Sequence, residues 1–407
     1  MWAPVLTELL QVNGASNIVF SSLALRHTAW VCGSTSDDVC DHQSTAWQTT
    51  STLHINAGSH ISVTGCDVAA SGSYGIWVNG TGVSDVSVTG CGIHDLGSGG
   101  VRVGTDVSPG PTNVLIANNT IARGGLAFPS GTPILVQKSS NVQVLSNDVG
   151  FFCYTGISVG WSWNYADPSG TGNVTVAYNH IHDLGSGTYR QLGDAMAGVY
   201  TLGVLHNTVV TNNFIRGVYA YYTGGYGLSQ DQGSSDITFR NNVVFSTTGA
   251  SQTQHYGVNN TYINNMFIGG FNTSSTPLNS ASVRAPAPPD QPSNFTFTRN
   301  VVVSTNTSGA LFDGYYLADG LHDLHFQGNL WWSSPDAGKS LETQPVNATH
   351  CSGPKQDAGS LIADPLISDP FHLNFTLAPD SPAFKLGFQP IDVRVTGTQV
   401  NPPPCPA

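Results

Sequence analysis

One short pattern recurs eleven times along the chain and limits its fold more than any other feature. Each copy has a polar residue, then three to five alternating apolar positions, and ends at Asn or Gly. Successive copies begin 24 to 43 residues apart, a repeat length typical of solenoids, in which each unit packs only on its neighbours. The copies are NIVFSSL from Asn17, HISVTGC from His60, DVSVTGC from Asp85, NVLIANN from Asn113, NVQVLSN from Asn141, NVTVAYN from Asn173, NTVVTNN from Asn207, DITFRNN from Asp236, NTYINNM from Asn260, NFTFTRN from Asn294 and DLHFQGN from Asp323.

The apolar positions within each copy alternate with a period of two, which predicts a strand and not a helix. Several strands per repeat, separated by turns, predict an all-β fold: a right-handed parallel β-helix of about 11 coils. Its apolar side chains would point inward and stack, and Asn side chains at the turns would form a ladder from coil to coil. Second strands are indicated by YGIWVNG (74–80), GVRVG (100–104), PILVQ (133–137), GISVG (156–160) and GVYTLG (198–203).

The repeat divides the chain into two parts. We expect residues 1–332 to form the β-helix, and 333–407 to form an irregular C-terminal extension that packs on it as a cap, since a solenoid must cover its apolar end. A repeat strand follows Met1 almost at once and no N-terminal cap is evident. We therefore expect the first coils of the domain to be missing from this chain.

Cysteines and glycosylation sequons favour a secreted protein. Two pairs of cysteines are candidate disulfides of a secreted protein: Cys32 with Cys40, and Cys351 with Cys405. N-x-S/T sequons occur nine times, although Asn- and Thr-rich repeats also produce them by chance. The N-terminal residues show no signal peptide. Two further cysteines, Cys66 and Cys91, share one phase of the repeat and should stack, either as a disulfide or as two free thiols; Cys153 is expected to be a buried free thiol.

Charge narrows the range of partners. The net charge of −12 disfavours nucleic acid and anionic membranes, and no apolar run of 18 residues or more occurs that could span a bilayer. A neutral or weakly charged ligand suits this composition better, and we expect a monomer that binds a polysaccharide or oligosaccharide.

Two aspartates are candidates for catalysis. Asp194 comes just before the strand GVYTLG, and Asp231 lies within GLSQDQGSS, about one coil later. Glycoside hydrolysis needs two carboxyl groups on neighbouring elements, one as acid and one as base or nucleophile. The acid should be the carboxyl in the more apolar pocket, because burial raises its pKa. The alternative is that each Asp only caps a turn.

Aromatic and polar residues gather near these aspartates. Aromatic faces stack on the apolar faces of sugar rings, although aromatics inside a β-helix also stack on one another. His255 could hydrogen-bond a substrate, tune a carboxylate or be purely structural. The predicted substrate-binding residues are Trp161, Trp163, Tyr200, Gln230, Gln254, His255 and Tyr256.

No metal or cofactor is predicted. His180 and His182 have the i, i+2 spacing of a metal-binding strand, but the same IHDLG motif occurs at 93–97, far from the candidate site. A repeated motif is better explained by turn structure. The sequence GSGGVRVG (97–104) is a turn between strands and not a phosphate-binding loop.

The segments 9–30, GISVGWSW (156–163), GVYTLG, DQGSS (231–235), QHYG (254–257), DPLISDPF (364–371) and the tail at 380–392 occur in this order. On these segments the chain resembles glycoside hydrolase family 141 and its uncharacterised relatives over nearly its whole length. The resemblance implies a β-helix acting on plant or algal polysaccharides, with α-L-fucosidase and xylanase activities among its members. It also implies that two aspartates carry the reaction, and these fall on Asp194 and Asp231.

The chain departs from the family pattern beside this site. The approach to the strand reads DAMAG (194–198), Gln232 replaces a usual Glu, and Ser229 replaces a usual Tyr. The leading hypothesis is a secreted glycoside hydrolase. One alternative is a polysaccharide lyase or epimerase, with a base from His255 or Tyr256 and Arg216 or Arg240 at the uronate. The other is a carbohydrate-binding β-helix without activity.

Overall fold

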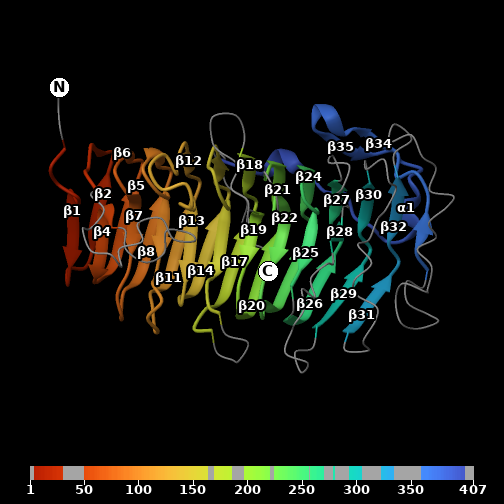
Figure 1. The fold of residues 1–407 in the computed structure, drawn as a ribbon, viewed down its shortest axis with the longest axis horizontal. Helices are drawn as coiled ribbons and strands as arrows, with labels where there is room; N and C mark the ends of the chain where they lie inside the picture. The colour runs from red at the N-terminus through yellow and green to blue at the C-terminus, as the bar shows by residue number, and fades with distance from the viewer. Residues whose placement is uncertain are drawn as a thin grey trace.

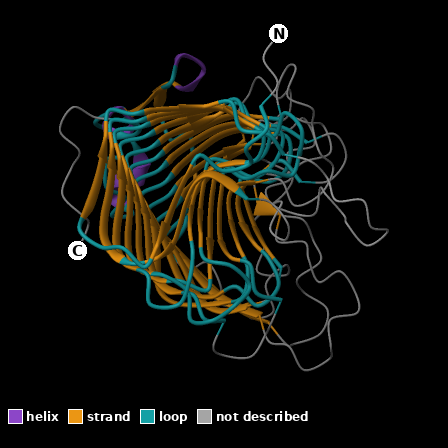
Figure 2. Ribbon diagram, turned by 90° about the vertical axis from the view of Figure 1, so that its left-hand side faces the viewer, coloured by secondary structure: helices purple, strands orange, loops and turns teal. Residues whose placement is uncertain are grey.

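Three long parallel sheets, wound around one another, form the body of the molecule (Figure 1). The computed structural model describes residues 4–30, 50–163, 169–185, 197–220, 224–255, 257–269, 278–279, 293–304, 322–333 and 359–398. Seen along its length, the body has the strands of the three sheets as its sides (Figure 2). The predicted all-β parallel β-helix is confirmed.

Each coil contributes one strand to each sheet, and neighbouring strands in a sheet come from successive coils. In the described residues, sheet A contains β1 (Leu10–Asn13), β4 (Ser51–Ala57), β7 (Tyr74–Val78), β10 (Val101–Val103), β13 (Ile134–Gln137), β16 (Ile157–Gly160), β19 (Ala197–Thr201), β22 (Tyr226–Gln230), β25 (Gln252–Gln254) and β28 (Leu278–Asn279). Sheet B contains β2 (Ile18–Ser21), β5 (Ser59–Thr64), β8 (Ser84–Thr89), β11 (Thr112–Ala117), β14 (Ser140–Leu145), β17 (Gly172–Ala177), β20 (Val204–Thr211), β23 (Ser235–Arg240), β26 (Gly257–Ile263), β29 (Ser293–Thr298) and β31 (His322–Gln327). Sheet C contains β3 (Ala24–Arg26), β6 (Asp67–Ser71), β9 (Gly92–Leu96), β12 (Thr120–Ala122), β15 (Asp148–Gly150), β18 (His180–Leu184), β21 (Phe214–Val218), β24 (Val243–Thr247), β27 (Met266–Gly269), β30 (Val301–Ser304), β32 (Leu330–Ser333) and β33 (Leu361–Ile362).

The eleven copies of the sequence pattern coincide with the strands of sheet B. The polar residue that opens most copies sits at a corner with a φ between 52° and 64°. Asn and Asp adopt this left-handed conformation more readily than other residues with a side chain, which explains the pattern. These corner residues are Asn17, His60, Asp85, Asn113, Asn141, Asn173, Asn207 and Asp236.

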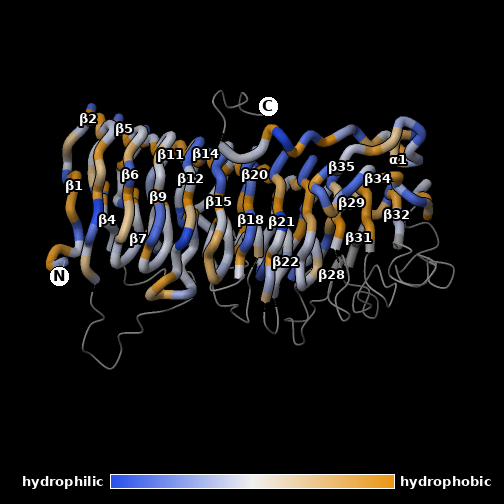
Figure 3. The backbone as a smooth tube through the Cα atoms, turned by 90° about the horizontal axis from the view of Figure 1, so that it is seen from above, coloured by the Kyte–Doolittle hydropathy of each residue, from blue (hydrophilic) through white to orange (hydrophobic). Residues whose placement is uncertain are grey.

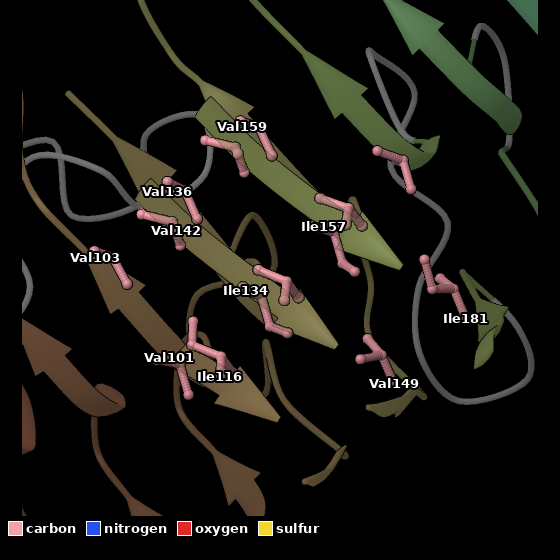
Figure 4. Packing of buried hydrophobic residues seen from close by; sticks show 14 of the residues in the cluster. Val101, Val103, Ile116, Ile134, Val136, Val142, Val149, Ile157, Val159 and Ile181 are labelled. Atoms are coloured by element: carbon pink, nitrogen blue, oxygen red, sulfur yellow. The ribbon is translucent and has the colours of Figure 1, made fainter. Parts of the chain in front are cut away.

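The core consists of apolar side chains stacked in columns along the axis (Figure 4). In sheet A, Val101 pairs with Ile134, which in turn pairs with Ile157. All three are fully buried. Because strands in one sheet keep register from coil to coil, every inward apolar position contacts its counterparts above and below, and the hydrophobic stabilisation is spread along the whole solenoid.

A buried asparagine ladder runs along the corner between sheets B and C, as the sequence predicts. Each side-chain amide except that of the last member donates to the side-chain oxygen of the next Asn and to a backbone carbonyl. The Asn213 nitrogen, for example, lies 2.9 Å from both the Asn242 oxygen and the Val176 carbonyl. Satisfied in this way, amides can be buried at little cost. The ladder comprises Asn119, Asn147, Asn179, Asn213, Asn242, Asn265, Asn300 and Asn329.

Cys91 and Cys66 occupy the two ladder positions before Asn119. The Cys91 backbone N–H donates to the Asn119 side chain at 2.9 Å, and the Cys66 N–H donates to the Cys91 sulfur at 3.4 Å. Both thiols, like that of Cys153, are free and buried. The predicted stacking of Cys66 on Cys91 is confirmed in its free-thiol form, whereas both candidate disulfides lie outside the described residues.

The C-terminal segment 359–398 runs back along the outer face of sheet C (Figure 3). It contains the antiparallel pair β34 (Ile367–Asp369) and β35 (Asn374–Leu377), a short helix α1 (Pro382–Lys385) and the 3-10 turns η5 (Pro370–His372) and η6 (Val393–Val395). Phe375 packs edge-on against Phe214 and Phe245 of sheet C. Further along, the Gly397 N–H donates to the Tyr178 carbonyl. Whether this extension also caps the last coil stays a prediction.

Among the described residues, no helix has the length and apolarity needed to cross a membrane.

Candidate active site

The candidate site lies on the outer face of sheet A, where β19 and β22 end. Along β19, Val199 and Thr201 point into the core, so Tyr200 between them points outward. Gly198 and Gly227 open these two strands at the corner with sheet C. A Cβ on Gly198 would lie 2.3 Å from Ile215, and one on Gly227 would lie 2.2 Å from Val244. Glycine at these positions lets β19 and β22 pack closely on sheet C.

Three successive coils bring Tyr200, Asp231 and His255 together. Asp231 follows β22 in a turn, where its N–H donates to the Thr201 carbonyl of the previous coil. The Tyr200 hydroxyl donates to Asp231 Oδ2 at 2.5 Å. His255 Nδ1 lies 2.7 Å from Asp231 Oδ1. Both oxygens of this carboxylate are therefore held by side chains from the coils on either side.

The carboxylate of Asp231 is ionised at neutral pH. Burial alone would raise its pKa, but hydrogen bonds from His255, Tyr200 and the Gln232 backbone, with the nearby charge of His255, hold the pKa below its usual value. An ionised carboxylate can act as a base or nucleophile but not as a proton donor. The rule that the more buried carboxyl is the acid therefore does not apply to Asp231, because its donors outweigh its burial.

Two tryptophans adjoin this group. The Trp161 ring packs against Tyr200 with ring centroids 5.7 Å apart and meets Trp163 edge-on at 5.9 Å. Trp161 is 4% exposed, whereas Trp163 is 50% exposed. Of the two predicted sugar-contacting tryptophans, only Trp163 presents its ring to solvent, and Trp161 lies beneath it.

Gln230 and Gln254 face the core, away from this surface. Both are fully buried. The Gln230 amide lies 2.5 Å from the Tyr262 hydroxyl, and the Gln254 oxygen accepts from Asn260 at 3.1 Å. Strand alternation explains this placement, because Ser229 and Thr253 take the outward positions of β22 and β25. These two glutamines support the floor of the site and do not line it.

Two predicted site residues, Asp194 and Tyr256, lie outside the described residues. What the sequence missed is the direct contact of Tyr200 with Asp231, since it assigned Tyr200 to substrate binding. A signal was present: Tyr200 and Asp231 are separated by 31 residues and Asp231 and His255 by 24, each close to one coil.

A second polar cluster lies on sheet C. Ligand atoms of Asp148, His180 and His182 lie within 4.8 Å of one another. The Arg216 guanidinium donates to His180 Nε2 at 3.1 Å, which places the imidazole proton on Nδ1, the atom facing Asp148. A metal there would have to displace that proton beside a fixed positive charge. The residues present do not fit a cation site.

The earlier IHDLG copy repeats the surroundings of His182, which lies 3.1 Å from Asp148 and 2.8 Å from Asp183, with Arg216 beside Asp183. His94 lies between Asp67 and Asp95, at 2.9 and 2.7 Å, and Arg123 pairs with Asp95. His94 and His182 occupy the same column of sheet C. The repeated motif thus builds ion-pair ladders on the outer face of the solenoid.

Comparison with known proteins identifies a family model and several solved structures that are similar to this chain. A family model described as "Right handed beta helix region" matches residues 51–267. Similar solved structures include one titled "Glycoside hydrolase", with 21% identity over 65% of this chain and 51% of that chain and a TM-score of 0.53. The complex of XylC with xylose has 11% identity over 86% of this chain and 54% of that chain, with a TM-score of 0.49.

A lacto-N-biosidase from Eubacterium ramulus has 14% identity over 75% of this chain and 49% of that chain, with a TM-score of 0.41. This chain spans about half the length of these three structures. At 21% identity, the similarity to the structure titled "Glycoside hydrolase" shows a shared fold and no more. No curated protein matches the chain in a sequence comparison.

Proposed function

The chain belongs to the right-handed β-helix family, and on that premise we propose that it is a secreted glycoside hydrolase that acts on a polysaccharide or oligosaccharide. One observation carries the proposal: the Asp231 carboxylate is held ionised by Tyr200 and His255 on the outer face of sheet A. The half-exposed ring of Trp163 contacts Trp161, which in turn packs against Tyr200. Glycoside hydrolysis uses a pair of carboxyl groups, and an ionised carboxylate beside an exposed aromatic ring is suited to be the base or nucleophile of that pair.

Asp231 takes the role of base or nucleophile. In an inverting reaction it would remove a proton from the attacking water; in a retaining one it would attack the anomeric carbon. Tyr200, His255 and the Gln232 backbone N–H occupy three of the about four lone-pair positions on its two oxygens, so that one is left for the reaction. The resemblance to glycoside hydrolase family 141 implies Asp194 as the second carboxyl of the pair. Because we give Asp231 the role of base or nucleophile, we propose Asp194 as the proton donor. Membership in that family, with fucosidase- or xylanase-like specificity, is part of the proposal.

The substrate would be bound by stacking. The exposed ring of Trp163 can lie against the apolar face of a sugar, and the ordered outer face of sheet A provides a rigid support. Sites built on strands of a solenoid keep their geometry because every strand is bonded to the coils above and below.

A lyase or epimerase is the second candidate. The bond between His255 and Asp231 favours it, because a carboxylate that orients a histidine also makes that histidine a better general base. Such chemistry requires a cation at the uronate carboxylate. Unsaturated products that absorb in the near ultraviolet would identify a lyase and exclude hydrolysis.

The test is a reducing-sugar assay on fucosylated, xylan-type and pectic glycans with Asp231→Asn and Asp194→Asn. The matched control is Asp236→Asn, five residues from Asp231. Its carboxylate pairs with His206 on sheet B, and its left-handed φ suits Asn. We expect both site variants to lose at least about a thousandfold in turnover and the control to keep it.

Turnover that survives both site substitutions would overturn the two-aspartate mechanism. Binding of a glycan without turnover on any member of the panel would identify a carbohydrate-binding β-helix instead.

A further inference from the structure

Two buried polar atoms beside Tyr200 have no hydrogen-bond partner within the described part of the chain. They are the Ser158 hydroxyl oxygen and the Trp161 indole nitrogen. Ser158 is fully buried and Trp161 is 4% exposed. Leaving a buried donor without an acceptor costs folding free energy, so a pair of such groups at one place requires an explanation.

Both groups flank the residue that holds Asp231. Ser158 in β16 pairs in register with Tyr200 in β19 and therefore faces the same outer side of sheet A. Trp161 follows three residues later, and its ring packs against Tyr200 with centroids 5.7 Å apart. The unpartnered atoms thus belong to the surroundings of the Tyr200–Asp231 pair.

The backbone of Trp161 is also unfavourable. Its φ is 54°, a left-handed conformation that bulky residues rarely adopt. Asn or Gly would suit this backbone better, and Phe would fill the space without burying an N–H. Phe151 and Tyr178 adopt the same conformation at other corners, so the backbone alone does not single out Trp161. What distinguishes it is the buried indole N–H that has no partner among the described residues.

We propose that Ser158 and Trp161 bind hydroxyl groups of a neutral sugar and hold it against Asp231, an inference that rests on the proposed function. The indole nitrogen only donates, the serine hydroxyl donates or accepts, and the ionised carboxylate only accepts. A sugar hydroxyl can accept from the Trp161 indole and donate to the Ser158 oxygen, which satisfies both groups and leaves the free lone pair of Asp231 for the reaction. A uronate or sulfate would bring a second negative charge against the Asp231 carboxylate. The site therefore selects neutral sugars over acidic ones.

Entry of the sugar requires side-chain movement, because both atoms are buried. Trp163, which is half exposed and meets Trp161 edge-on, is the side chain placed to move. A rotation of the Trp163 ring would open a path to the Trp161 indole, and the same ring would then stack on the bound sugar.

The experiment measures stability and binding in the same variants. Trp161→Phe and Ser158→Ala each remove one unpartnered group. The control is Ser251→Ala, whose hydroxyl is also buried without a partner among the described residues but precedes β25, at the end of that strand away from His255. Calorimetric titrations use L-fucose, D-xylose and D-galacturonate as probes, and thermal unfolding is followed by circular dichroism.

We expect all three variants to unfold at the same temperature as the wild type or higher. Trp161→Phe and Ser158→Ala should weaken binding of a neutral sugar roughly three- to tenfold each, whereas Ser251→Ala should leave it unchanged. A residue with a purely structural role would not lower affinity while preserving stability.

The outcomes separate this inference from the proposed function. A wild type that binds or hydrolyses a neutral glycan, with both variants binding as tightly, overturns the roles of Ser158 and Trp161 only. A preference for galacturonate overturns the neutral-sugar assignment. A wild type that neither binds nor cleaves any glycan overturns the proposed function and this inference together.

Discussion

Tyr200 and Asp231 lie in adjacent coils, 31 residues apart in sequence, and their side-chain oxygens are 2.5 Å apart. A hydrogen bond from a phenol to a carboxylate stabilises the ionised form of the acid. Here it acts with His255 on the other oxygen, so that a partly buried carboxyl on the outer face of sheet A keeps its charge.

Replacing Tyr200 by Phe should move the acid limb of the activity profile to higher pH. The pKa of Asp231 is lowered in the folded protein, so its activity as a base is present above that pKa and lost as the pH falls through it. Without the hydrogen bond from the phenol, the effect of burial on Asp231 is less well offset, and the pKa of the carboxyl rises. The dependence of kcat/KM on pH measures the shift.

Tyr219→Phe is the control for this shift. The Tyr219 hydroxyl lies 3.2 Å from Ser246 Oγ and touches no carboxylate in the described part of the chain, so the profile should keep its midpoint. An acid limb that stays in place in Tyr200→Phe would show that the contact does not set the charge of Asp231.

Trp163→Ala should raise KM about two- to tenfold, the range expected for loss of one aromatic stacking contact. Its ring is 50% exposed, so the unfolding temperature should barely change. Phe371→Ala, which removes a 63% exposed ring on the C-terminal segment, should leave KM as it is. Equal KM values for the wild type and Trp163→Ala would remove the proposed sugar platform.

Asn213→Ala should destabilise the protein by about 2–4 kcal/mol, because it leaves buried partners in the ladder unsatisfied. The Asn179 side-chain amide and backbone N–H would lose the Asn213 oxygen as acceptor, and the Asn242 oxygen would lose one of its two donors. Urea unfolding measures the loss. Asn374→Ala, at an exposed position of β35, should lower the free energy of unfolding by less than about 0.5 kcal/mol. Equal costs would mean that the ladder adds nothing beyond a surface amide.

Cys91→Asn should extend the ladder by one position and stabilise the protein by about 0.5–1.5 kcal/mol. Cys91 already receives the Cys66 N–H, and its sulfur lies 3.6 Å from the Val63 carbonyl. An amide there could donate to that carbonyl and to the Asn119 oxygen, as the later ladder members do. Cys91→Ala, which removes the acceptor, should be less stable than the wild type. A lower urea midpoint for Cys91→Asn would contradict the prediction.

The repeat made the fold predictable from sequence, because in a solenoid the same residues satisfy both the local backbone conformation and the packing between coils. An apolar residue at alternate positions must face inward in any parallel coil, and Asn at a corner serves both the left-handed backbone and the ladder. The stacking of Cys66 on Cys91 followed from phase alone, since equal phase in successive coils means direct contact.

The site was predictable only in part. Spacing placed Asp231 and His255 one coil apart, but nothing in the sequence indicates which face a side chain takes at the end of a strand. The sequence therefore predicted that Gln230 binds substrate beside Asp231. In the structure the Gln230 side chain faces the core, because it lies one position earlier in the chain. The position of Asp194 stays a prediction.

The sequence by itself determined the architecture. Apolar residues alternate within each strand, the strand pattern recurs once per coil, and a polar residue marks the corner before it. Only the tertiary structure decided the charge state of Asp231, because its pKa depends on donors from two other coils that no local pattern specifies. The same holds for Ser158 and Trp161, whose missing partners become evident only when every neighbouring coil is in place.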